Sequence, residues 1–320
     1  MTFKTASILA LALCSGLIGA CQTTKLKDGD PRQVGPPEAI DPAKAQPYDP
    51  HLLDKGPPDP LGAFLADLDK SIRAWTNLTL TAATPADRNK ARGVQEALRR
   101  SVRERQKDLV DALETGPPRN RVIAAGALGF SDSKDVQGPL LVALKDQNTE
   151  VVQNAALSLA LLQNAETPLE PLVEVFQGSS NPQARANAAY AIRNLLEAGA
   201  APTEDVIKAA RRSLVDSEPF AQAQGALILA LAKDGESVPD LAELLHANSA
   251  LVIGAATQAL VALGRGDPKL LGPTARALVV GLGTCPDEQR PYLLRNLVLL
   301  SGHNYADDVK AWTEWSQRLP

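Results

Sequence analysis

Apolar residues recur at helical spacing along most of this chain, beginning at residue 61. Steps of three and four residues place one set on a single face of an amphipathic helix. This set is Leu61, Phe64, Leu65, Leu68, Ile72 and Trp75. Thr84 and Pro85 then predict the N-cap and first position of a second helix. Apolar residues continue at helical spacing from Val94 to Leu113, which predicts one continuous helix over 85–113.

From residue 117 onward the chain repeats itself. The segments Arg121–Leu128, Val152–Leu159 and Asn181–Ile192 are similar, and looser copies end at Leu229 and Leu260. A sixth unit surrounds Leu293–Leu300, and a turn and a second apolar stripe follow each copy. Two helices in each period of about 31 to 37 residues predict an all-α superhelix of about six stacked helical hairpins.

The copies carry a recognisable motif of a small or acidic residue, proline, arginine and paired alanines. Asn181–Ile192 fits it closely, and Pro118–Val122 and Glu218–Ala221 fit it loosely. This resembles the short bacterial form of the HEAT-repeat family, over roughly residues 105–320. The large aromatic residues of the tetratricopeptide repeat are lacking. The paired alanines are small enough for helices to approach closely, and each hairpin needs a neighbour to cover its apolar face.

The last helical segment contains two of the three tryptophans, Trp312 and Trp315. Three residues apart, they share a helix face, and the surrounding sequence resembles the ending of many bacterial HEAT-repeat proteins. In that ending, Ala306 stands where the family often has glycine. We interpret the tryptophans as a cap over the last repeat. A contact site for a partner is the alternative.

The N-terminal segment has a basic start, a short apolar run and small residues before Cys21. This pattern is typical of a secretory signal, and it resembles the lipobox of bacterial lipoproteins. The resemblance implies that residues 1–20 are removed and that Cys21 carries a diacylglycerol. An ordinary secretory signal is the alternative. In lipoproteins retained at the inner membrane, an aspartate usually follows the acylated cysteine, whereas this chain has Gln22. The difference favours the outer membrane, facing the periplasm, in a Gram-negative cell. In a cell with a single membrane, we expect the outer face of that membrane.

Residues 21–60 show no helical or strand periodicity, and nine of the 24 prolines lie between Pro31 and Pro60. Such composition predicts a disordered, extended tether. The chain therefore divides into a signal peptide (1–20), a lipid-anchored tether (21–60), an N-terminal helical cap (61–115) and a repeat solenoid (116–320).

Charge is distributed unevenly along the chain. The net charge of -4 argues against a nucleic-acid partner. Residues 85–107, however, hold eight basic side chains against three acidic ones. A tethered module could use them to bind anionic lipid, lipopolysaccharide or peptidoglycan, whereas a solvated helix face is the simpler interpretation. The candidate contacts are Arg88, Arg92, Arg99, Arg100, Arg103 and Lys107.

The sequence contains no motif for nucleophilic catalysis, zinc hydrolysis or nucleotide binding. The three histidines are far apart, Cys285 stands alone, and single acidic residues at the repeat turns are attributed to helix capping. We therefore expect no enzyme activity, cofactor, metal or small-molecule substrate. The expected function is a membrane-anchored scaffold or adaptor of the bacterial envelope that binds a protein or peptide on its concave face. The alternative is the anionic-surface module.

Overall fold

The computed structural model describes residues 60–320, and every regular element in that range is helical. The all-α fold predicted from the sequence is confirmed. The α-helices are α1 (Leu61–Thr81), α2 (Pro85–Glu104), α3 (Gln106–Thr115), α4 (Pro118–Ala127), α5 (Gln137–Ala143), α6 (Thr149–Leu162), α7 (Glu170–Gly178), α8 (Pro182–Glu197), α9 (Glu204–Ser213), α10 (Pro219–Leu231), α11 (Val238–Glu243), α12 (Ala250–Gly266), α13 (Pro268–Thr284), α14 (Arg290–Ser301) and α15 (Val309–Gln317). Short 3-10 turns, including η3 (Leu128–Phe130) and η4 (Lys134–Val136), join some of them.

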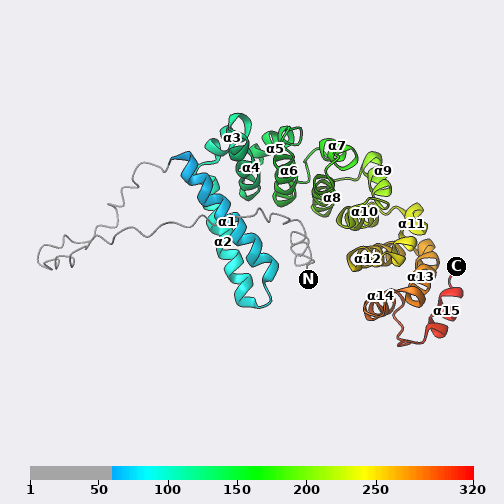
Figure 1. The fold of residues 1–320 in the computed structure, drawn as a ribbon. Coiled ribbons are helices and arrows are strands. Elements are labelled where there is room, and N and C mark those ends of the chain that lie inside the picture. Colours follow the sequence, from blue (N-terminus) through cyan, green and yellow to red (C-terminus); the bar gives the residue numbers. More distant parts are fainter. Residues whose placement is uncertain (1–59) are drawn as a thin grey trace, which may run out of the picture.

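The helices form two rows along a curved superhelix (Figure 1). Helices α4, α6, α8, α10 and α12 line the inside of the curve, and α3, α5, α7, α9 and α11 lie outside them. Each outer helix and the inner helix after it make a hairpin, so α3 to α14 form six, which is the predicted number. The predicted pairing of each alanine-rich helix with the apolar stripe after it is wrong, because the inner helices α4, α6, α8 and α10 pack on the outer helix that precedes them.

The inner helices pack mainly against one another. Their paired alanines are the reason, because side chains of this size let helix backbones approach closely. All six are completely buried: Ala124, Ala125, Ala155, Ala156, Ala188 and Ala189. Hydrogen bonds also connect the inner helices α4 and α6. Asn154 donates to the carbonyl oxygen of Val122 at 2.9 Å, and the Ser158 hydroxyl donates to that of Ala125 at 2.5 Å.

A long hairpin of α1 and α2 stands at the N-terminal end of the superhelix. Thr84 caps α2 as predicted, in a capping box with Asp87. The single helix predicted over 85–113 is wrong, since the backbone leaves helical geometry at Arg105, with φ -131°. Arg105 instead lies over the Phe64 ring, 4.4 Å from its centroid, and pairs with Asp108 at 2.7 Å. These contacts hold a bend that separates α2 from α3.

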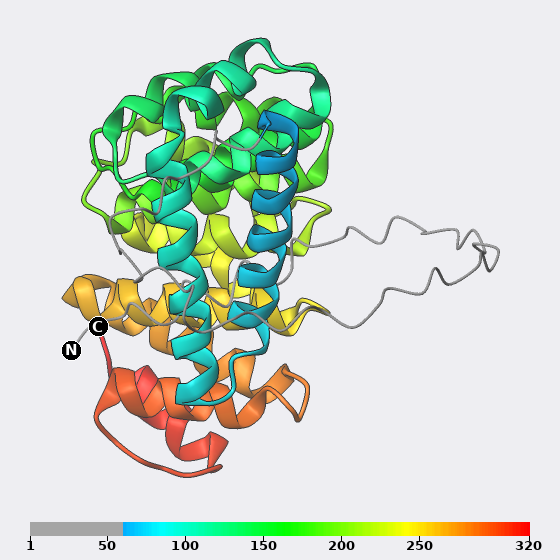
Figure 2. The same cartoon turned by 90° about the vertical axis from the view of Figure 1, so that its left-hand side faces the viewer.

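The α1–α2 hairpin lies across the inner row rather than extending it. Figure 2 shows the two helices side by side, running steeply across the repeats. Helix α1 packs on α4 and α2 packs on η3. The buried Trp75 ring meets the Phe130 ring edge-on, with centroids 5.0 Å apart. The hairpin therefore bounds one side of the concave space (Figure 1).

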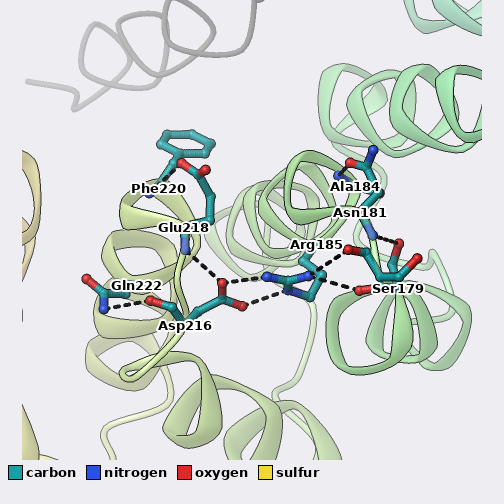
Figure 3. A network of polar contacts seen from close by, with 9 residues as sticks. Ser179, Asn181, Ala184, Arg185, Asp216, Glu218, Phe220 and Gln222 are labelled. Atoms are coloured by element: carbon teal, nitrogen blue, oxygen red, sulfur yellow. Dashed lines mark hydrogen bonds and ion pairs between the residues drawn. The ribbon is translucent and has the colours of Figure 1, made fainter.

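Arginine–aspartate pairs join neighbouring repeats at two junctions of the superhelix. In Figure 3, Arg185 of α8 reaches Asp216 in the turn before α10 through two parallel hydrogen bonds of 2.7 Å each. Arg185 also donates to the carbonyl oxygen of Ser179 at 3.0 Å, and Asp216 accepts the backbone N–H of Glu218 at 2.8 Å. One ion pair thus connects two turns and two inner helices.

Arg121 of α4 and Asp146 in the turn before α6 repeat this arrangement at 2.8 and 3.1 Å. The attribution of turn carboxylates to capping is wrong for Asp146 and Asp216. The caps of α6 and α10 are Asn148 and Glu218, two residues further on. The aspartates bind arginine instead, and the hydrogen bond from arginine lowers the pKa of each carboxyl below its ordinary value.

At the C-terminal end, α15 packs on α13. Trp312 is completely buried, and its indole N–H donates to the carbonyl oxygen of Ala306 at 3.0 Å. Trp315 is half-buried, with its ring 5.7 Å from that of Trp312. Ala306 has φ 46°, the left-handed conformation that glycine adopts most easily. This explains why glycine is frequent there in the resembling family.

We predict that Asp216→Asn lowers the free energy of unfolding by about 2 kcal/mol at neutral pH, because Arg185 loses its charged partner in a mostly buried site. The folded-state pKa of Asp216 lies below its ordinary value of 3.8. The stabilising effect is therefore complete above pH ~4 and is lost as the pH falls through the lowered folded pKa. Urea unfolding followed by circular dichroism at several pH values measures this difference.

Glu166→Gln is the matched control, since it breaks the exposed Lys134–Glu166 pair at the same kind of inter-repeat position. Its urea midpoint should stay at the wild-type value. Equal midpoints for Asp216→Asn and Glu166→Gln would contradict the role of the buried pair.

Candidate functional site

A groove opens on the concave side where α1 crosses α4 and α6. We call it the concave groove, and its volume is about 410 Å³. Apolar side chains form its floor, and polar side chains of α1 and α6 stand at its rim. The lining includes Asp69, Ile72, Arg73, Trp75, Thr76, Asn77, Val122, Ile123, Gly126, Phe130, Glu150, Asn154, Leu157, Ser158 and Leu161.

Several of these rim groups are held in place. Arg73 donates to Asp69 at 3.1 Å, and this bond raises the pKa of Arg73. Asn154 is fixed by its bond to Val122. A half-buried apolar floor with a preorganised polar rim suits an apolar side chain flanked by backbone or polar groups. Such a combination is typical of a peptide.

A second groove lies on the other side of the hairpin, and we call it the lateral groove. It runs between α2 and the loops that follow α4 and α6, with a volume of about 420 Å³. Gln95 and Arg99 form its α2 side, and Lys134 of η4 and Gln137 of α5 also line it. Phe130 lines both grooves from below.

The basic residues singled out from the sequence lie at the α2 surface or the start of α3. Arg88, Arg92, Arg100, Arg103 and Lys107 are exposed, and Arg99 is half-exposed at 40%. Arg99 pairs with Glu96 at 3.2 Å, and Arg103 pairs with Asp132. Within residues 60–320, no ion pair involves Arg88, Arg92 or Arg100. The structure therefore brings these cations to one helix and leaves several of them unneutralised.

Neither groove contains the residues of a catalytic site. Among the described residues, no group of three or more histidine, cysteine or acidic side chains could hold a metal ion. Cys285 is half-buried, and burial raises the pKa of its thiol, so it is a weak nucleophile at neutral pH. The lowered aspartate pKa values are explained by structural ion pairs. In the part of the chain that the structure covers, no helix is both long and apolar enough to cross a membrane.

Sequence reasoning did not find the concave groove. Its two walls come from segments about 80 residues apart, and no spacing rule connects α1 with α6. The local pattern that could have pointed to this part of the chain is the oppositely charged pair Asp69 and Arg73, four residues apart on one helix. Cys21, the signal peptide and the tether lie outside the described residues, and the domain boundaries stay predictions.

Residues 107–193 match the family model for HEAT repeats. The match runs from α3 into α8 and contains the alanine-rich inner helices α4 and α6. The resemblance inferred from the repeated motif is confirmed for this segment. The described chain as a whole is an all-α superhelix of stacked helical hairpins.

Several solved structures are similar to this chain. An engineered protein is 20% identical with a TM-score of 0.48, over 61% of this chain and 98% of its own. The CpcE–CpcF complex of phycocyanin lyase from Nostoc is 17% identical with a TM-score of 0.39, over 80% and 99%. A designed armadillo repeat protein in complex with the peptide (KR)4 is 18% identical with a TM-score of 0.38, over 79% and 99%. No curated protein matches the chain in sequence.

Proposed function

We propose that this protein is a lipid-anchored scaffold of the bacterial envelope that binds a protein or peptide partner on its concave face. The concave groove is the observation that carries the proposal. It combines an apolar floor, Leu157 and Leu161 among it, with fixed polar groups such as Asn154 at its edge. A peptide offers both kinds of contact along its length.

The repeat architecture supports the same function. Stacked hairpins present a long, continuous inner surface, and rigid packing of the inner helices keeps that surface in one shape. A preformed surface binds with less loss of conformational entropy than a flexible one.

The anchor part of the proposal comes from the sequence. The lipobox-like segment ending at Cys21 supports acylation there, and residues 22–60 would then tether the solenoid to the membrane. Two or three acyl chains hold a protein on a membrane stably, whereas one chain does so only weakly. Gln22 favours the outer membrane of a Gram-negative cell.

Thr76→Trp tests the concave groove. Thr76 is half-buried in its wall, and an indole ring there fills space that a partner's side chain would occupy. A photo-crosslinking residue at position Asn77 should first capture and identify the partner. The partner is then purified for binding measurements. Its affinity for the full chain should fall at least tenfold in Thr76→Trp, as measured by calorimetry.

Thr81→Trp is the control, because Thr81 is exposed at the end of the same helix and does not line the groove. It should retain wild-type affinity. A crosslinker at the exposed Val142 of outer helix α5 should give no specific product. Unchanged affinity in Thr76→Trp, or equal crosslinking at Asn77 and Val142, would refute binding in this groove.

Cys21→Ala tests the anchor. We expect the variant to leave the membrane fraction and to incorporate no labelled fatty acid, because the acylated thiol is gone. Fractionation and palmitate labelling in the native host measure both. Labelling that persists in Cys21→Ala would show that the lipobox interpretation is wrong.

A further inference from the structure

Four arginines of α2 form a row along one side of the helix. Arg88, Arg92, Arg99 and Arg103 are spaced by four, seven and four residues, which keeps them within about 60° around the helix axis. The row is about 22 Å long at 1.5 Å per residue. We call it the arginine row.

The row is only partly neutralised. Arg99 and Arg103 both approach Asp132, so two cations share that carboxylate, while Glu96 offers a second partner to Arg99 alone. Arg88 and Arg92 are exposed, and neither forms an ion pair among the residues the structure describes, although Arg88 lies close enough to Asp87 to lower the pKa of that carboxyl. Several guanidinium groups therefore remain available, and each can hold a carboxylate through two parallel hydrogen bonds.

The row leads into the lateral groove. Arg99 belongs to both, and Lys134, which pairs with Glu166, lies on the opposite wall together with Asp132. Gln95, Ser133 and Gln137 supply further hydrogen-bonding groups. Arg88, Arg92 and Arg103 lie on α2 outside the groove lining, so the row meets the groove at Arg99. A narrow, chain-shaped ligand can follow the row into the groove as far as Arg99, whereas a flat membrane surface would reach the outer cations more easily than Arg99.

We propose that the arginine row and the lateral groove bind an acidic segment of the partner protein, a run of about seven residues rich in aspartate and glutamate. This length follows from the row, because an extended chain advances about 3.3 Å per residue. The inference rests on the proposed scaffold function and names a second, electrostatic contact beside the concave groove. Phe130, which lines both grooves, makes the two sites neighbours.

The test uses the full chain and a fluorescein-labelled peptide of eight glutamates, followed by fluorescence anisotropy at several salt concentrations. Wild-type protein should bind the peptide, more weakly as salt rises, and should not bind a peptide of eight lysines. Arg88→Glu combined with Arg92→Glu should weaken binding at least tenfold. Both side chains are exposed, so the fold should be preserved, as circular dichroism would verify.

Lys90→Glu combined with Arg100→Glu is the matched control. It changes the net charge by the same amount on the same helix, but Arg100 lies about a quarter turn from the row and Lys90 lies on the opposite side. Its affinity should stay within threefold of wild type. Equal losses in the two double variants would overturn the inference, since attraction would then depend on total charge alone.

A second arm measures binding to vesicles that contain phosphatidylglycerol. Vesicle binding that depends on the row, with no binding of the glutamate peptide, would overturn the inference in favour of a membrane contact. The test of the acidic-segment site can be distinguished from the test of the concave groove. Thr76→Trp should leave glutamate-peptide binding unchanged, so either site can fail while the other stands.

Discussion

The structure depends on one constraint, which is that each helical hairpin buries its apolar face only against the next hairpin. The inner helices meet this constraint with paired alanines such as Ala155 and Ala156, whose small side chains allow close packing. Close packing alone does not set the angle between repeats. Half-buried arginine–aspartate pairs add a directional contact at two junctions, as where Arg185 and Asp216 connect the turns of neighbouring repeats with bonds of defined length and direction. Curvature and rigidity follow from these two features together.

The candidate binding sites are a consequence of that curvature and of the α1–α2 hairpin. Had α1 and α2 simply continued the stack, the concave face would be open and even. Instead, the bend at Arg105 turns the hairpin across the inner row, and the Trp75 ring packs edge-on against the Phe130 ring. A groove forms on each side, apolar beside α1 and basic beside α2. The two differ in chemistry because the hairpin's own helices differ in their exposed residues.

The sequence predicted those features that depend on local pattern. Alanine pairs and a period of about 31 to 37 residues predict stacked hairpins, and Thr84 with Pro85 predicts the start of α2. The break at Arg105 was missed because the apolar stripe continues through it in helical register. At the break, Arg105 contacts Phe64, about 40 residues earlier, and periodicity does not reveal such a contact. The roles of Asp146 and Asp216 were missed for the same reason, since their arginine partners lie 25 and 31 residues away.

A partner that occupies the grooves beside the α1–α2 hairpin should shield their walls from solvent. Hydrogen–deuterium exchange of the full chain, with and without the identified partner, measures this shielding. We predict slower exchange in residues 69–77 of α1 and 150–161 of α6, which form the walls of the concave groove. The outer helices α5, α7 and α9 should exchange at unchanged rates. Protection confined to those outer helices would contradict the account.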